Sequence, residues 1–555
     1  MNPKRGELLS CMMASLLPFG LACSGGGTST NAPPAANLPP TVIAGLDQSV
    51  VEGAAVTLSA TASDPDGTIA SYQWAQTGGP SVSLSGSTTA QASFIAPQVT
   101  TATTLTFTIT VTDNRGASAY DSVIVTTNDS APATGYKYLV QNTAYIAPEY
   151  GTAPAKFGTA TNSVTGATLK RLTNSSETAA AAKGSLVVYS RFSPTNSAKN
   201  KIIIHGEDST SAWVVDLATG AILRNLLHSD GTSIGEVNEI RWDGSNSFPS
   251  RIYYVRDLAF YQQDVATGIS TLVRDFASIA GGPYPNGAFI FNDVEGDSSN
   301  DSRYWCWMVL EITTGGPYPV KKIFTYDKQT DTVLGIRNPS DFGKTGSIPR
   351  PNMVEISPLG TKAVIHFDRA FAGNRDEDIG TVLDGPHAWP LTLTGTPVKV
   401  SIDATHAGWS LDASGAEWFV SQNNVTDFIE ARRLSDGTTI HLLYHGDLGW
   451  NNGFHFGKFH TKRGWAFVST YSSSDSAVAD NQLFMVKLQD MSAGIVMQRV
   501  SPTYIAYPGN DAYRNEGQAA LSMDGNSIYW TCNWGGAFPY REAVGIDLPS
   551  DWDTH

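Results

Sequence analysis

The sequence predicts an all-β protein, with a seven-bladed β-propeller preceded by an immunoglobulin-like β-sandwich. The 52 Gly and 29 Pro residues are spread along all 555 positions, which favours many short strands over long helices. Residues 40–128 alternate apolar and polar positions between turns, and residues 135–555 contain an internal repeat. A chain of this length exceeds one compact core, so we expect separate domains within these two segments.

The N-terminus resembles a bacterial lipoprotein signal. Lys4 and Arg5 precede an apolar run over residues 8–21, and Cys23 is followed by Ser-Gly-Gly-Gly. This predicts a signal peptide over 1–22 and lipidation at Cys23, with ordinary signal cleavage as the alternative. The run is shorter than the roughly 20 residues of a membrane-spanning helix. We therefore expect an exported protein, secreted or held at the outer membrane by its lipid anchor alone.

Residues 23–39 are small and polar and predict a flexible linker before the sandwich at 40–128. The segments that define the sandwich are Asp64-Pro-Asp-Gly67, Ser71-Tyr-Gln-Trp74, Phe94-Ile-Ala-Pro97 and Val111-Thr-Asp-Asn-Arg-Gly116. They resemble the polycystic-kidney-disease (PKD) type domain that many secreted bacterial polysaccharide-degrading enzymes carry. The resemblance implies a spacer with carbohydrate adhesion at most. Asp64 and Asp66 fit either turn residues or calcium ligands.

The repeat in 135–555 joins a polar or Gly-rich turn to a following strand. It recurs seven times, beginning at Ser193, Trp242, Asp297, Ser357, Ser410, His460 and Ser522. A second, offset repeat of the Asp-x-x-Thr-Gly type, as at Asp216 and Asp264, marks another hairpin in the same unit. Two hairpins per unit predict four-stranded blades, and seven blades stacked about an axis leave a channel.

Polar side chains precede these turns and are expected on the innermost strands. They are Glu239, Arg241, Asn292, Asp293, Glu355, His406, His455, Arg514 and Glu516. Such a ring can form a site or simply line a hydrated channel, and both interpretations stay open. We assign Arg241, His406 and His455 to substrate binding.

Charge and motifs exclude several function classes. A net charge of −15 disfavours nucleic acid and anionic membrane as partners. An anionic substrate would need a local cluster of Arg, Lys or His. We find no Gly-rich phosphate loop, nucleophile elbow or His-Glu-x-x-His motif. Cys306 and Cys532 lie in aromatic-rich strands, which predicts buried packing residues.

Two histidines follow strands of the first repeat unit. His205 closes the strand Lys-Ile-Ile-Ile-His, and His228 lies in the turn Leu-Leu-His-Ser-Asp-Gly. A neutral imidazole can act as general base or acid near neutral pH, with a tyrosine as partner. The alternative is that each histidine caps a strand end.

The densest charged segment runs from Phe291 to Trp305. Asp293, Asp297 and Asp301, together with Glu295, repel one another unless a cation neutralises them. A Ca²⁺ ion held by the three aspartates and a turn network with Arg303 explain the segment equally well.

Three segments of the repeat region resemble one known protein family more specifically. They are Tyr189-Ser-Arg-Phe-Ser-Pro194, Glu239-Ile-Arg-Trp-Asp-Gly244, and Asn292-Asp-Val-Glu-Gly-Asp297 with its continuation to Tyr304. Over residues 135–550 the chain resembles polysaccharide lyase family 24, the seven-bladed ulvan lyases. The resemblance implies β-elimination at a 4-linked uronate next to sulfated rhamnose, without an organic cofactor.

The same resemblance implies two histidines, one tyrosine and one arginine around the uronate. By order and spacing the first three match His205, His228 and Tyr304 as catalytic residues. No arginine matches the fourth, because the corresponding stretch holds Lys321 and Lys322. Lys321 or another cation is expected to neutralise the carboxylate, and Arg303 to contribute to substrate binding.

Two further hypotheses remain. A lyase resembling the oligogalacturonate lyases would use a metal, with candidate ligands His406, His455, His460, Glu516 and Gln518. A non-catalytic surface propeller would instead bind glycan or protein, as many propellers do. Convergence of His205, His228 and Tyr304 in one cleft would favour the first lyase hypothesis, and their separation would favour binding.

Overall fold

The structure is a computed structural model. It describes residues 37–51, 54–97, 103–128, 139–140, 145–174, 184–206, 211–293, 295–314, 316, 318–342, 351–367, 385–401, 404–449, 452–472, 477–505, 518–537 and 541–554. The predicted export segment, Cys23, Arg514 and Glu516 lie outside these ranges. The chain divides into two compact units, Met1–Asp129 and Ser130–His555. Among the described residues no helix has the length and apolar character to cross a membrane.

The first unit is a β-sandwich. Its strands are β1 (Thr41–Ile43), β2 (Gln48–Val51), β3 (Ala55–Ser59), β4 (Thr61–Ser63), β5 (Ile69–Gly78), β6 (Gln91–Ile95), β7 (Thr103–Asp113) and β8 (Ser118–Asn128). The main sheet has the order β2-β8-β7-β5, and β3 pairs with β6. Alternate residues of β7 point into a core around Trp74, where the rings of Phe94 and Phe107 lie 4.7 Å apart. This alternation is what half-buried strands require.

The aspartates of the sandwich turns have partners within the unit. Asp66 accepts a hydrogen bond from Arg115 at 2.8 Å, and Asp64 accepts one from the backbone of Asp66 at 3.3 Å. Both contacts belong to a turn network.

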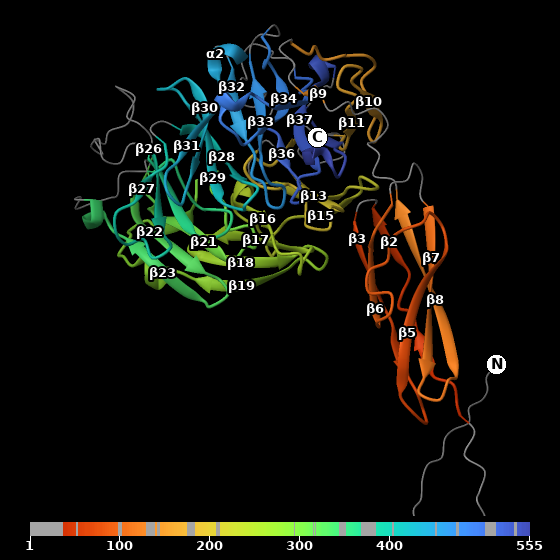
Figure 1. The fold of residues 1–555 in the computed structure, drawn as a ribbon. Helices are drawn as coiled ribbons and strands as arrows, with labels where there is room; N and C mark the ends of the chain where they lie inside the picture. The colour runs from red at the N-terminus through yellow and green to blue at the C-terminus, as the bar shows by residue number, and fades with distance from the viewer. Residues whose placement is uncertain are drawn as a thin grey trace, which may run out of the picture. The chain divides into compact units, whose positions relative to one another are not determined.

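The second unit is a seven-bladed β-propeller (Figure 1). Blade 1 contains β12 (Ser185–Val187), β13 (Lys201–Gly206), β14 (Ala212–Asp216) and β15 (Ile222–Asn225). Blade 2 contains β16 (Arg241–Trp242), β17 (Arg251–Arg256), β18 (Ala259–Asp264) and β19 (Ile269–Asp275). Blade 3 contains β20 (Ala288–Phe291), β21 (Tyr304–Glu311), β22 (Val320–Asp327) and β23 (Thr332–Arg337). Blade 4 contains β24 (Met353–Ile356), β25 (Lys362–Phe367), β26 (Gly385–Pro390) and β27 (Val398–Lys399).

The remaining blades follow the same antiparallel order. Blade 5 contains β28 (Ala404–Leu411), β29 (Glu417–Asn423), β30 (Phe428–Arg433) and β31 (Thr439–Tyr444). Blade 6 contains β32 (Gly453–Phe456), β33 (Trp465–Tyr471), β34 (Gln482–Lys487) and β35 (Met497–Pro502), and β9 (Leu139–Val140) adds a fifth strand. Blade 7 contains β36 (Ala520–Leu521), β37 (Ser527–Cys532) and β38 (Glu542–Asp547). The short helices are η2 (Val237–Glu239), α1 (Ala277–Ala280), η3 (Pro339–Phe342), α2 (His445–Leu448), η4 (Met491–Ala493), η6 (Trp534–Gly536) and η7 (Trp552–Thr554).

The last blade is completed from the start of the propeller. Strand β11 (Thr168–Arg171) pairs with β38, with Leu169 opposite Ile546, and β10 (Thr159–Thr161) pairs with β11 in turn. The backbone of Ser185 in blade 1 also donates to Arg541, next to β38, at 2.8 Å. N- and C-terminal strands of this unit therefore share one sheet, as the adjoining labels β10, β11 and β37 indicate in Figure 1.

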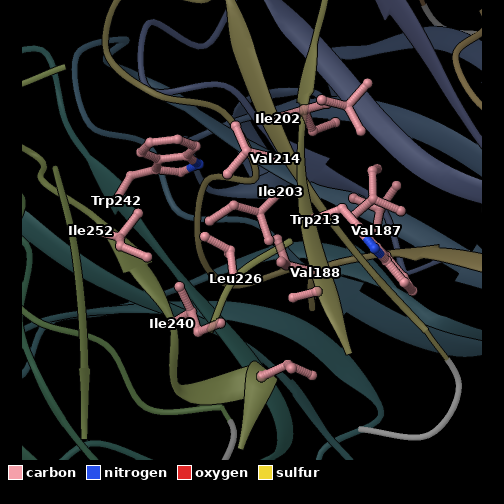
Figure 2. Close-up of a cluster of buried hydrophobic side chains, with 14 of the residues drawn as sticks. Val187, Val188, Ile202, Ile203, Trp213, Val214, Leu226, Ile240, Trp242 and Ile252 are labelled. Atoms are coloured by element: carbon pink, nitrogen blue, oxygen red, sulfur yellow. The ribbon is translucent and has the colours of Figure 1, made fainter. Parts of the chain in front are cut away.

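Neighbouring blades bury their faces against each other. Figure 2 shows this between blades 1 and 2, where Ile203 and Val214 lie with Ile240 and Ile252 in one apolar cluster. The Trp242 indole also donates to the Pro194 carbonyl at 2.8 Å. A blade has two apolar faces, so stacking is the arrangement that removes both from water.

Both cysteines of the folded part are buried and free, in agreement with the packing role expected from sequence. Burial raises the pKa of the Cys532 thiol to about 12 and also raises that of Cys306. Neither thiol is therefore set up as a nucleophile.

Candidate functional site

Antiparallel strand order sorts the strand ends of each blade onto two faces of the propeller. We call the face where second strands end and third strands begin the loop face, and the opposite one the turn face. The bridge between Trp409 and Lys458 is parallel, so the first strands of blades 5 and 6 run in the same direction. The loop face carries the connections from one blade to the next, such as Asn225 to Arg241. Connections of this kind commonly carry function on a rigid scaffold.

His228 lies on the loop face, after the fourth strand of blade 1. Its Nδ1 is 2.6 Å from the hydroxyl of Tyr254 in β17, and its ring packs edge-on against Tyr261. Burial raises the pKa of Tyr254 to about 12, so this hydroxyl keeps its proton near neutral pH. When Nδ1–H of His228 donates to the tyrosine oxygen, the lone pair on Nε2 can accept a proton.

His205 is the penultimate residue of β13, at the same face of the same blade. It is 7% exposed, and its Nδ1 lies 3.1 Å from the Gly206 carbonyl oxygen. This contact fixes the ring at the strand end. The structure therefore brings both sequence-predicted histidines to the loop face of blade 1.

Tyr304 lies on the opposite side of the propeller. It begins β21, whereas His205 lies next to the end of the equivalent strand of blade 1, so Tyr304 belongs to the turn face. Its ring covers Gly360 so closely that a Cβ there would overlap it, and the Arg303 guanidinium lies 4.6 Å from the ring centre. The structure does not bring Tyr304 together with His205 and His228. This separation is the outcome that favours a binding propeller over a lyase site built from these three residues.

Arg303 shares the turn face with Tyr304. It makes two hydrogen bonds to the Asp327 carboxylate, at 3.0 and 2.7 Å. This interaction lowers the pKa of Asp327. Arg303 was predicted to contact substrate. In the structure its guanidinium instead links the start of β21 to the end of β22.

Tyr254, the partner of His228, was not among the candidate residues predicted from the sequence. It lies in the run Arg251-Ile-Tyr-Tyr-Val-Arg256, where two adjacent tyrosines face opposite sides of the strand. Tyr254 belongs to the apolar cluster shared with blade 1, and Tyr253 to the cluster shared with blade 3. The alternation was visible in the sequence, but which tyrosine faces His228 depends on the packing of blades.

Two cationic side chains also lie on the loop face. Arg256 ends β17 and pairs with Asp230 at 3.1 Å, two residues after His228. Lys321, near the start of β22, pairs with Glu311 at 3.0 Å. Both are partly exposed, so either can meet an anionic ligand, although each already has a carboxylate partner.

A cavity of about 360 Å³ opens between blades 2 and 3 on the loop face. Its lining residues are Gly235, Glu236, Glu239, Val255, Arg256, Asp257, Phe289, Ile290, Phe291, Leu310 and Tyr318. Arg256 belongs to this lining and also pairs with Asp230, which lies near His228. The cavity and the His228–Tyr254 pair therefore lie on either side of β17.

Buried charged side chains of different blades meet near the propeller axis. Arg191 of blade 1 pairs with Glu355 of blade 4 at 2.6 Å, and Glu355 also contacts His366 Nε2 at 2.7 Å. These contacts hold the pKa of Glu355 at about 2. Burial raises the pKa of nearby Glu295 to about 7, although Arg191 lies 3.9 Å away. Arg191 of blade 1 and Glu355 of blade 4 can meet only near the axis of the ring. Because Glu355 lies in β24, the first strand of its blade, the first strand is the innermost one.

The other axial candidates fall into two groups. Asp297 lies between Arg241, at 3.3 Å, and Lys458, at 2.9 Å. His406 and His455 lie with ring centres 4.5 Å apart, and burial lowers the pKa of His455 to about 3. Arg241 is thus engaged in an ion pair, while the two histidines are close enough to act on one ligand.

One carboxylate of the acidic segment, Asp297, is neutralised by protein cations. Asp297 has the two partners above, and Asp301 accepts hydrogen bonds from Ser299 at 2.6 Å and from the Arg303 backbone at 3.0 Å. Across the described ranges, no three His, Cys, Asp or Glu side chains are arranged to hold a metal ion. The calcium site at Asp293, Asp297 and Asp301, which the sequence suggested as one alternative, stays a prediction.

Comparison with known proteins identifies the first unit. Residues 44–127 match the family model of a PKD domain. The solution structure of the PKD domain from KIAA 1837 protein is 34% identical over 17% of this chain and 92% of its own, with a TM-score of 0.15. The PKD1 domain of Vibrio anguillarum Epp is 24% identical over 17% of this chain and 99% of its own, with a TM-score of 0.14.

The second unit has more distant structural neighbours. The oligogalacturonate lyase VPA0088 from Vibrio parahaemolyticus covers 72% of this chain and 98% of its own, at 10% identity and a TM-score of 0.49. No curated protein matches the chain. The protein thus combines a PKD-type sandwich with a seven-bladed β-propeller.

Proposed function

We propose that the protein is an exported polysaccharide lyase that cleaves a uronate-containing polymer by β-elimination on the loop face. The observation that carries the proposal is the 2.6 Å contact between His228 Nδ1 and the Tyr254 hydroxyl, beside the cationic Arg256. A histidine oriented by a second group is the usual arrangement of a general base.

The reaction removes the proton at C5 of the uronate and breaks the bond between C4 and the glycosidic oxygen. A C4–C5 double bond forms, and the leaving oxygen takes up a proton. Nε2 of His228 is the proposed base, with Tyr254 holding its ring. Arg256 neutralises the carboxylate, which acidifies the C5 proton, and His205 protonates the leaving oxygen.

This assignment differs from the one expected from the family resemblance. Tyr304 is left out because it belongs to the turn face, and Arg256 takes the place proposed for Lys321. The resemblance to family 24 makes ulvan the first polymer to test. Export and lipidation at Cys23 remain part of the proposal, and loss of membrane association in Cys23→Ala would support the anchor.

The test is the ultraviolet absorbance of unsaturated uronate during incubation with ulvan, pectate and other uronate polymers. We expect product with the wild type and loss of product with His228→Ala, while Tyr304→Phe, a tyrosine change on the other face, stays active. Product that requires Tyr304 but not His228 would overturn the site. Retained glycan binding without product on any polymer would make the propeller a binding protein.

A further inference from the structure

The contact between His228 and Tyr254 joins two blades, because His228 follows the last strand of blade 1 and Tyr254 lies in blade 2. A third residue of the same region, Gln263 in β18, is fully buried. It stands opposite Ile252 in the antiparallel pairing of β17 and β18. Opposed residues share a face of a sheet, and Ile252 and Tyr254 belong to the apolar cluster with blade 1, so Gln263 faces that blade too.

The amide nitrogen of Gln263 holds both sides of the contact. Nε2 donates one hydrogen bond to the Leu227 carbonyl oxygen at 2.7 Å and another to Ser270 Oγ at 2.9 Å. Leu227 immediately precedes His228 in the chain. Ser270 in turn hydrogen-bonds the Tyr254 hydroxyl. One side chain therefore holds the backbone next to the histidine and, through a serine, the hydroxyl that the histidine meets.

The oxygen of the same amide indicates why a glutamine stands here. Gln263 Oε1 is buried and has no hydrogen-bond partner among the residues that the structure describes. A buried acceptor without a partner destabilises a fold, and an apolar side chain of the same length would avoid that cost. Packing alone therefore does not account for the glutamine, whereas the two hydrogen bonds donated by its nitrogen do.

We infer that Gln263 is a positioning residue for His228, an inference that rests on the proposed function in taking His228 as the general base. By holding Leu227 and Ser270 at once, Gln263 fixes the imidazole and the tyrosine ring relative to each other. Nδ1–H of the histidine then stays directed at the tyrosine oxygen, and Nε2 stays free to take the proton from C5. Without this connection the imidazole can turn or exchange tautomers, which lowers kcat and leaves substrate binding intact.

The kinetic test uses the full-length protein and Gln263→Met, which keeps the length of the buried side chain but donates no hydrogen bond. We expect kcat on the polymer that gives product to fall about tenfold with KM within about twofold, since no substrate contact is lost. Ser270→Ala is the milder variant, because it keeps the hydrogen bond to Leu227, and kcat should fall about threefold.

Gln498→Met is the matched control. Gln498 in β35 of blade 6 is also fully buried, and its Nε2 donates to the Trp552 carbonyl oxygen at 2.9 Å. The substitution removes the same kind of hydrogen bond away from the loop-face histidines. We therefore expect kcat and KM of Gln498→Met to equal those of the wild type.

A spectroscopic measurement tests the positioning without substrate. In protein labelled with ¹⁵N-histidine, the ring nitrogen signals report which nitrogen carries the proton, and His228→Ala identifies the signals of His228. We expect a single tautomer, with the proton on Nδ1, in the wild type and in Gln498→Met. Gln263→Met should show a mixture of both tautomers.

The outcomes separate this inference from the proposed function. Unchanged His228 signals in Gln263→Met, or an equal change in Gln498→Met, would overturn the positioning role even if His228→Ala abolishes product formation. A changed tautomer balance in Gln263→Met alone, without product on any polymer, would retain the positioning role and reject the lyase. If Gln263→Met does not fold, the His228 signals of Ser270→Ala decide, and an unchanged spectrum there would overturn the inference.

Discussion

The two faces of the propeller use similar residues in different ways. On the turn face, Tyr304 and Arg303 meet Asp327 and Gly360 in contacts that join strands and neighbouring blades. On the loop face, His228 and Tyr254 form one short contact beside a cavity, and Arg256 reaches from that cavity to Asp230. The comparison indicates that the strand end on which a residue lies, and not its type alone, decides which neighbours its side chain can meet.

The largest expected effect is a loss of activity on substitution of a loop-face residue. Substituting His228 by Ala should lower kcat/KM at least about 100-fold, the lower range for loss of a general base. Steady-state kinetics on the responsive polymer measures this. A comparable loss of kcat/KM in Tyr304→Phe would contradict the assignment of activity to the loop face alone.

The next effect concerns the stability of the turn face. Asp327→Ala removes both hydrogen bonds from Arg303 and should lower the free energy of unfolding by about 2 kcal/mol while kcat stays unchanged. The pKa of Asp327 is lowered in the folded state, so its contribution is present above the unfolded pKa and is lost as the pH falls through the folded value. Denaturant titrations should therefore show wild type and variant converging in acid; a constant difference across pH would contradict the ion-pair explanation.

A smaller effect is expected at Tyr254. Tyr254→Phe keeps the ring stacked on Tyr261, 5.5 Å away, and removes only the hydroxyl that meets His228. We expect kcat to fall about tenfold with KM unchanged, since the tyrosine positions the base and makes no substrate contact. If KM rises while kcat stays constant, Tyr254 contributes to binding instead.

The smallest effect is expected for Tyr304→Phe. The ring that covers Gly360 is kept, so activity and unfolding free energy should stay within about twofold and 0.5 kcal/mol of the wild type. The same two measurements used above provide this comparison.

Much of the fold followed from local signals in the sequence. The turn at Ser357 and the Asp-x-x-Thr-Gly hairpins at Asp216 and Asp264 predicted blade units, because they fix where strands begin and end. The completion of blade 7 by β11 could not be predicted from such local signals. Its four residues, Thr168–Arg171, carry no repeat, and their partner lies at the far end of the chain.

The site was predicted less completely, for two physical reasons. Spacing along the chain matched Tyr304 to the histidines, but the face of a residue is set by whether it starts or ends its strand. The pairing of His228 with Tyr254 depends on contact between blades, which no local pattern encodes. The acidic segment illustrates the same point, since Lys458 from blade 6 neutralises Asp297 of blade 3.

The completion of blade 7 by β11 has a consequence for the folding of the propeller. Pairing of β11 requires β38, so closure of the ring depends on contacts that are distant in sequence, and contacts of this kind slow folding. A chain shortened before Glu542 would leave β11 and β37 as unpaired edges, which promote aggregation. Closure of the ring therefore depends on β38, a strand remote in sequence from its partner β11.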